Sequence, residues 1–311
     1  MNSPTETAAL FRLVHNHPDV VSAWIDRTTQ PPTLRIRRAA GPLSTAAGPT
    51  ARPAHRPLRI PGPLAHLKWQ IDQAAPLRDL RAPFPSPTPF NDNTACQNEP
   101  VQLGCQVQPA GAPWVGTAGL PVRWRDLESR DHWGFLSNWH VLCVSPDSEG
   151  HPQHQPDDSH PAFATLANWN PVHPDQPNTL DAAIANACMG GRHTIDREIL
   201  GIGRPADQPT DAHVGLAVKK SGRTTALTYA ECAATGAAVR VSYGGFTAIF
   251  QDQDVYEDVD GHFSAAGDSG SAILTAADAS PTSLLFAGGG NQTIGCPIRF
   301  AIDRFRLLFP F

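Results

Sequence analysis

The chain has 311 residues, of which 41% are hydrophobic, so it is long enough for two domains or for one large domain with a sizeable core. Its formal net charge of −5 gives no global attraction to nucleic acid or to an anionic membrane surface. No apolar run reaches the roughly 18 residues that a membrane-spanning helix requires. We therefore expect neither a nucleic acid nor a membrane as a partner.

The N-terminus and the cysteines favour a protein that is not exported. Residues 1–6 contain neither a basic n-region nor an apolar h-region, so we predict no secretory signal. No two cysteines form a C-x-x-C pair, which argues against a structural zinc site. Cys96 and Cys105 are near enough to close a short loop, but without an export signal we favour reduced thiols and a cytoplasmic location. The six cysteines are Cys96, Cys105, Cys143, Cys188, Cys232 and Cys296.

Residues 1–38 predict a small α/β segment. Ser3 is a suitable N-cap, Pro4 occupies the first helical position, and Glu6 completes a capping box, so we expect a helix over 3–16. Alternating residues then predict a strand over 20–26 and a second strand of a hairpin over 33–37. A unit of this size is too small to be stable alone, and we expect it to pack on the rest of the chain.

Residues 39–100 predict a proline-rich linker or arm. Residues 39–63 are rich in Pro, Ala, Gly and Arg and indicate an extended linker. Apolar residues at helical spacing predict a short helix over 64–75. Residues 76–100 are again rich in proline, and we interpret them as a covering or spacer arm. The alternative, a segment that lies across an active-site groove, stays open.

From residue 101 to residue 311 the pattern is mostly β. Many short strands without helices between them indicate a sandwich or a barrel. Apolar residues at helical spacing then predict an amphipathic C-terminal helix over 298–309. The expected strands are 101–107, 119–124, 133–138, 180–187, 213–218, 238–243, 246–252, 271–274 and 284–288.

The turn at residues 267–271 carries the clearest chemical signal. Gly267 and Gly270 bracket Ser269, so the backbone there is free to adopt conformations that other residues avoid. Such a turn would expose a serine hydroxyl and aim backbone N–H groups at a developing oxyanion. A glycine- and serine-rich hairpin turn without chemistry is the alternative that these residues alone leave open.

A nucleophilic serine needs a base and an acid that orients the base. His140 follows the apolar run 133–138, which gives the imidazole a rigid mount. Asp181 is flanked by apolar residues, and a buried carboxylate there would be compensated by a histidine N–H. An aspartate that caps a turn is the alternative. The histidines of the polar segment 151–160 are close together, but their surroundings indicate an exposed loop rather than a metal site.

These blocks resemble the catalytic blocks of chymotrypsin/trypsin-like serine peptidases. The order His140, Asp181, Ser269 differs from that of α/β-hydrolases and of subtilisins. Further similarity is to the group that includes the plant narrow-leaf protease and its bacterial relatives, whose members also carry a small N-terminal α/β segment. The matching segments are 137–142, 180–185, 218–225, 241–244, 267–271 and 284–288.

The resemblance implies a trypsin-like double β-barrel with the site between the barrels. It implies His140 as general base and acid, Asp181 as its orienting partner and Ser269 as nucleophile, with the N–H groups of Gly267 and Ser269 as the oxyanion hole. The function expected is a serine endopeptidase that needs no cofactor and no metal. The alternatives are a catalytically weak peptide-binding or regulatory protein on the same fold, and a serine esterase.

Substrate binding is also implied by the resemblance. An extended peptide would pair with the edge strand near Phe286, Ala287 and Gly288. Phe263 stands six residues before the serine, where trypsin-like enzymes carry an acidic residue that selects Lys or Arg, and this favours an apolar or small residue before the cleaved bond. Asp268 has no freed N-terminal amine as a partner, because no activation-cleavage site is visible. Three partners stay open for it: Lys219, Arg223 or backbone donors.

Overall fold

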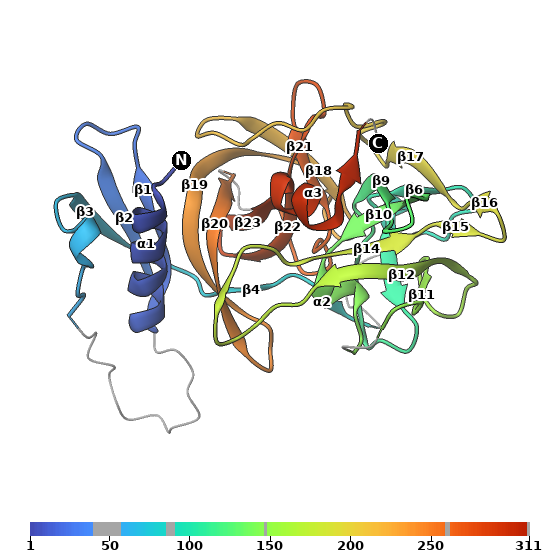
Figure 1. Cartoon of the computed structure of the whole chain (residues 1–311), viewed down its shortest axis with the longest axis horizontal. Helices are drawn as coiled ribbons and strands as arrows, with labels where there is room; N and C mark the ends of the chain where they lie inside the picture. The colour runs from blue at the N-terminus through green and yellow to red at the C-terminus, as the bar shows by residue number, and fades with distance from the viewer. Residues whose placement is uncertain (40–56, 85–90, 146–147, 259–261, 310–311) are drawn as a thin grey trace.

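The computed structural model describes residues 1–39, 57–84, 91–145, 148–258 and 262–309. Most of the predicted linker, 40–56, and the prolines of the segment 85–90 lie outside these ranges. Figure 1 shows an N-terminal unit in blue, then a barrel drawn mainly in orange and red, then a barrel drawn mainly in green. The mostly β class predicted from the sequence is confirmed.

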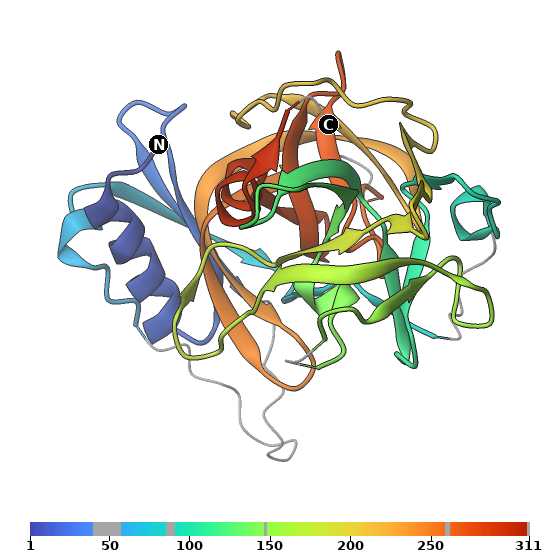
Figure 2. The ribbon, with the colours of Figure 1, turned by 45° about the vertical axis from the view of Figure 1, so that its right-hand side comes forward.

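The N-terminal unit extends the sheet of the neighbouring barrel. Helix α1 (Pro4–Asn16) begins with the predicted capping box, in which Ser3 Oγ accepts from the Glu6 N–H. Strand β1 pairs with β19, placing Ser22 opposite Val239, so the unit is continuous with the barrel sheet (Figure 2). The expected packing on the rest of the chain is thus confirmed. The other elements are β1 (Val20–Asp26), β2 (Thr33–Ala39), η1 (Gly62–Leu64) and β3 (Lys68–Ala74).

The predicted helix over 64–75 is wrong. The segment forms the short 3₁₀ helix η1 and then strand β3, which pairs in parallel with β2 along its whole length. The outer edge of β2 offers unpaired backbone groups, and pairing with them outweighs a weak helical periodicity. Ile71, an apolar residue of that segment, is 40% exposed, so β3 does not bury an apolar helical face.

The first barrel is a closed ring of antiparallel strands. Strands β8 and β9 are separated only by Ala118 and Gly119, so together they act as one bent strand, and hydrogen-bonded neighbours then run β7, β8/β9, β10, β14, β12, β11 and back to β7. Strand β24 (Leu307–Leu308) pairs with Arg123 and Trp124 of β9. The ring strands are β7 (Gln106–Pro109), β8 (Trp114–Thr117), β9 (Leu120–Arg125), β10 (Asp131–Ser137), β11 (Pro152–His154), β12 (Ala162–Asn170) and β14 (Ala182–Asn186).

The second barrel closes in the same way. Strand β19 pairs with both β18 and β20, and the ring runs β20, β23, β22, β21, β18, β19. Every strand range expected from the sequence overlaps an observed strand, and the predicted double β-barrel is confirmed. The ring strands are β18 (Ala217–Gly222), β19 (Ala226–Ser242), β20 (Thr247–Glu257), β21 (Ala272–Thr275), β22 (Pro281–Gly289) and β23 (Gln292–Pro297).

Short elements connect and cover the rings. The C-terminal helix is confirmed but shorter than predicted, because α3 (Ile298–Phe305) ends where Arg306 adopts a left-handed conformation with φ 53° and the chain turns into β24. The remaining elements are β4 (Leu77–Asp79), β5 (Ala82–Pro83), η2 (Asp92–Thr94), β6 (Val101–Leu103), α2 (Trp139–Leu142), β13 (Pro177–Asn178), β15 (Cys188–Met189), β16 (Arg192–His193) and β17 (Ile195–Ile199).

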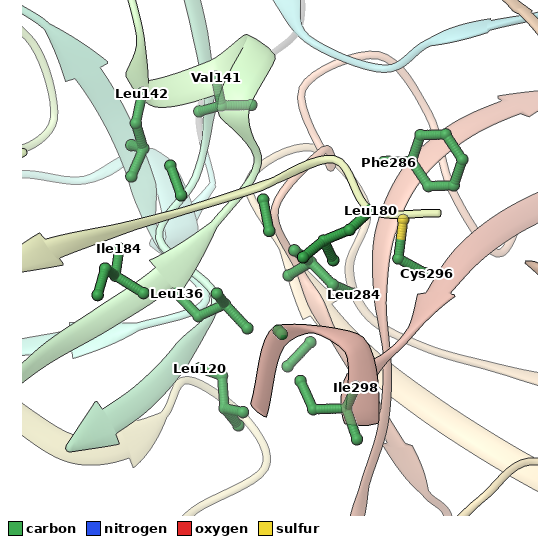
Figure 3. Packing of buried hydrophobic residues seen from close by; sticks show 14 of the residues in the cluster. Leu120, Leu136, Val141, Leu142, Leu180, Ile184, Leu284, Phe286, Cys296 and Ile298 are labelled. Carbon is green, nitrogen blue, oxygen red and sulfur yellow. The ribbon is translucent and has the colours of Figure 1, made fainter. Parts of the chain in front are cut away.

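One hydrophobic cluster spans both barrels and fixes them to each other. Figure 3 shows Leu136 of β10 and Ile184 of β14 packed in the same region as Leu180, Leu284 of β22 and Ile298 of α3. All are nearly inaccessible to solvent. Interiors of this density deform little, so residues held at the junction of the barrels keep a defined geometry.

The described residues contain no helix long and apolar enough to cross a membrane. All six cysteines are free, so Cys96 and Cys105 do not close a loop. Burial raises the pKa of the Cys105 thiol to about 12, which leaves it protonated and unreactive.

Candidate active site

Three side chains that are far apart in sequence meet at the junction of the barrels. Asp181 Oδ2 lies 2.6 Å from His140 Nδ1, and His140 Nε2 lies 2.8 Å from Ser269 Oγ. All three residues are almost completely buried. The structure therefore brings together the base, the acid and the serine that the sequence singled out.

Strand pairing in the first barrel explains why His140 and Asp181 meet. The end of β10 lies opposite the beginning of β14, with Ser137 paired to Ala183. The chain then enters the short helix α2, whose first turn carries His140, while Asp181 immediately precedes β14. Asn138 Nδ2 donates to the Asp181 carbonyl at 2.8 Å and fixes the two segments.

The carboxylate determines which nitrogen of His140 carries the hydrogen. An ionised carboxylate only accepts hydrogen bonds, so Nδ1 donates to Asp181 and Nε2 is left to accept from Ser269 Oγ. The backbone N–H of His140 also donates to Asp181 Oδ1 at 3.3 Å. This is the orientation a general base for the serine requires.

Tyr243 is a further partner of Asp181 to which the sequence assigned no role. Its hydroxyl donates to Oδ2 at 2.7 Å, and its ring meets the His140 ring edge-on at 5.5 Å. Burial, reinforced by the negative charge of Asp181, raises the pKa of Tyr243 well above its ordinary value, so it is a neutral donor. The only signal in the sequence was its place in the matching segment 241–244.

Replacing Tyr243 with phenylalanine should lower kcat by about 10- to 100-fold, since a hydrogen bond to a charged group contributes about 1.5–3 kcal/mol. We expect KM to change little, because the hydroxyl contacts Asp181 and not the Leu80 segment. Tyr229→Phe, at an exposed position, is the matched control. A kcat for Tyr243→Phe equal to that of the control would exclude this positioning role.

Both glycines around the serine are required by the geometry of the turn. Gly267 has φ 106° and Gly270 has φ 96°, in the region that side chains disfavour. A Cβ on Gly270 would lie 2.1 Å from Ser137 Oγ. Thr117 anchors the turn to the first barrel, because its N–H donates to the Ser269 carbonyl at 2.8 Å and its hydroxyl donates to the Gly267 carbonyl at 2.9 Å.

The N–H groups of Gly267 and Ser269 point to a single oxygen atom. Both donate to the carbonyl of Leu80, the Ser269 N–H at 3.3 Å. The N–H of Leu80 in turn donates to Ser269 Oγ at 2.9 Å. Two donors thus converge on one peptide carbonyl beside a serine hydroxyl, and that carbonyl belongs to a segment of the chain itself.

Asp268 is held by Lys220 and by backbone donors. Its Oδ2 lies 3.4 Å from Lys220 Nζ and accepts from the Ala265 N–H at 2.9 Å. Its Oδ1 accepts from the N–H groups of Thr224 at 2.7 Å and Thr225 at 3.2 Å. Lys220 and Asp268 are both fully buried. Burial lowers the pKa of Lys220, and the charge of Asp268 opposes that change.

Of the three partners left open for Asp268, only the backbone donors are confirmed. Lys219, one residue from the true partner, instead donates to the Ala276 carbonyl at 3.1 Å. Arg223 Nε donates to Gln106 Oε1 at 2.7 Å. Alternation along β18 explains the difference, because neighbouring side chains on a strand point to opposite faces and only Lys220 faces the interior.

The predicted substrate-binding residues surround Leu80. Gly288 and Ala287 on β22 lie opposite Arg78 and Asp79 of β4. Phe263 is buried in the apolar cluster that contains Leu80. The three residues named from the sequence therefore lie beside the segment that contains Leu80.

The histidines of the segment 151–160 form no cluster. His151 Nε2 lies 2.9 Å from the Ala110 carbonyl, and His154 Nδ1 lies 2.7 Å from the His160 carbonyl. Across the part of the chain that the structure describes, no group of three or more His, Cys, Asp or Glu residues is arranged to hold a metal ion.

Comparison with known proteins finds likeness in structure only. No family model matches the sequence, and no curated protein matches it. Among solved structures, a glutamic-acid-specific serine protease is 20% identical over 67% of this chain and 98% of its own, with a TM-score of 0.48. Cellulomonas bogoriensis chymotrypsin is 19% identical over 67% and 97%, with a TM-score of 0.47. Nocardiopsis protease is 16% identical over 68% and 99%, with a TM-score of 0.49.

The strand topology is the firmer basis for classification. Two closed rings of β-strands meet around the three side chains, and a C-terminal helix packs against them. The strand pairing makes the chain a double β-barrel, the fold that the resemblance in sequence implied.

Proposed function

We propose that the protein is a serine endopeptidase that cleaves peptide bonds through an acyl-enzyme. The observation that carries the proposal is the continuous chain of contacts from Asp181 through His140 to Ser269, which ends beside two N–H groups that converge on one carbonyl oxygen. Protein and peptide chains are the substrates that such a cleft accommodates in extended form.

In this proposal His140 takes the proton from Ser269 as the hydroxyl attacks the peptide carbonyl. The oxyanion is stabilised by the N–H groups of Gly267 and Ser269, and His140 then gives its proton to the leaving amine. Asp181 keeps the imidazole in the required tautomer and stabilises its charged form. A water molecule hydrolyses the acyl-enzyme by the same steps in reverse order. The reaction needs no cofactor.

The experiment is cleavage of a mixed peptide library by the purified full chain, with the cut positions identified by mass spectrometry. Because Leu80 covers the oxyanion hole, the Leu80→Asp variant is tested in parallel. We expect cuts after apolar residues that disappear in Ser269→Ala. Hydrolysis of esters without peptide cleavage would favour an esterase, and peptide binding without any hydrolysis would favour a peptide-binding protein.

A further inference from the structure

The segment 77–83 passes through the cleft in the extended form of a substrate. On one side of Leu80, strand β4 runs antiparallel to β22, with Arg78 opposite Gly288 and Asp79 opposite Ala287. On the other side, strand β5 runs antiparallel to β8, with Ala82 opposite Val115. The segment thus bridges from the second barrel to the first (Figure 1, β4 in cyan). Strand addition on both sides of one residue fixes which peptide bond lies at the serine.

That bond joins Leu80 to Arg81. The Leu80 carbonyl oxygen accepts from Gly267 and Ser269, and its amide nitrogen lies 2.9 Å from Ser269 Oγ. The carbonyl carbon is two bonds from that nitrogen and one bond from that oxygen, so it is placed beside the hydroxyl. No other carbonyl of the described residues accepts from both donors.

The side chain of Leu80 fills an apolar pocket. It is 7% exposed and belongs to a cluster that includes Phe263, Tyr256 and Leu285. A Cβ on Gly288 would lie 2.9 Å from Leu80 Cδ1, so the glycine leaves the room that this side chain uses. Burying a charge among these apolar side chains would be costly, so a cation is disfavoured in place of Leu80.

We propose that the Leu80–Arg81 bond is a self-cleavage site, and that the peptidase prefers leucine, or an apolar side chain of similar size, before the cleaved bond. The proposal rests on the function proposed above. Ser269 Oγ bonds to the Leu80 carbonyl carbon while its proton moves to His140 Nε2. The carbon–nitrogen bond to Arg81 then breaks, and the proton on His140 passes to the Arg81 nitrogen. One water molecule completes hydrolysis, leaving a carboxylate on Leu80, an amine on Arg81 and a restored serine.

The cut chain stays together. Residues 1–80 remain joined to the second barrel through β1 and β19, with Ala23 opposite Ala238, and through the apolar cluster around α1. Arg81 stays near the first barrel, where its guanidinium lies 4.7 Å from the Trp114 ring centre. The Leu80 carboxylate is still held beside Ser269 by the pairing of β4 with β22, so the cut chain inhibits itself while that pairing lasts.

The test is intact-mass analysis of the purified full chain over time. We expect conversion into two fragments, 1–80 and 81–311, with a new N-terminus at Arg81, while Ser269→Ala stays intact. The rate should not depend on protein concentration, and the wild-type chain should not cut Ser269→Ala added to it. Leu80→Asp should not be cut after residue 80, whereas the exposed-site control Arg12→Gln, on α1, should be cut like the wild type.

The outcomes separate this proposal from the one on which it rests. If Leu80→Asp cleaves the peptide library in a Ser269-dependent way but the wild-type chain stays whole or is cut elsewhere, the self-cleavage site is refuted and the peptidase stands. If neither chain hydrolyses any peptide, both proposals fail.

Gly288→Ala provides a second test if Leu80→Asp does not fold. A Cβ at this position crowds the Leu80 side chain and should slow self-cleavage at least tenfold. An unchanged rate in Gly288→Ala would refute the assigned pocket.

Discussion

Replacing Ser269 with alanine should lower kcat/KM for peptide hydrolysis by about 10⁴- to 10⁶-fold, because the acyl-enzyme pathway is lost while peptide binding remains. The measurement is best made in the Leu80→Asp background, where the chain's own strand does not compete for the cleft. Ser159→Ala, an exposed serine remote from the cleft in sequence, is the matched control and should behave as the parent does.

His140→Ala should cause a loss of similar size, and the double variant should be scarcely worse than either single one. The two side chains act as a unit, since the hydrogen bond between His140 Nε2 and Ser269 Oγ is useful only if both are present. His213→Ala, at an exposed position, controls for loss of a histidine. Losses that simply multiply in the double variant, or a loss below tenfold in either single one, would argue against a shared role.

Lys220→Met should destabilise the fold by about 3–5 kcal/mol, because it leaves Asp268 buried without its cation. The measurement is the free energy of unfolding from urea titration, together with peptide hydrolysis. Activity should fall with stability, since Asp268 lies between the two residues whose N–H groups donate to the Leu80 carbonyl. Lys219→Met is a close control, as its side chain lies on the other face of the same strand and is partly exposed.

A double variant tests whether the charge pair itself is responsible. Asp268→Asn combined with Lys220→Met removes both charges, and we expect it to recover most of the stability lost in Lys220→Met. Equal stability of Lys220→Met and Lys219→Met would show that the pair is not important. The Asp268→Asn single variant is measured as well. If the double variant loses as much free energy of unfolding as the two single variants lose together, packing rather than charge is responsible.

The candidate site was predictable because its residues lie in short local segments with recognisable patterns. His140, Asp181 and Ser269 each lie beside an apolar strand that places them, so local pattern and chain order singled them out, and the resemblance to serine peptidases supplied their expected roles. The positive φ angles of the two glycines around Ser269 were predictable for the same reason, because such angles at a tight turn favour glycine.

The errors arose where long-range pairing decides the structure. Strand β3 exists because the edge of β2 is available, and no pattern within 64–75 contains that information. Lys220 differs from Lys219 only in the face of β18 that it occupies, and the register of that strand is set by partners far along the chain. The entry of Leu80 into the cleft likewise depends on pairing with β22, about two hundred residues later in the sequence.

The most direct test of the account is a mass measurement on the Leu80→Asp chain after reaction with a fluorophosphonate, which modifies serines that an adjacent base activates. We predict one adduct per chain, mapped to Ser269, and its absence in Leu80→Asp chains that also carry His140→Ala. An unmodified Leu80→Asp chain, or an adduct on another residue, would contradict the claim that His140 activates Ser269.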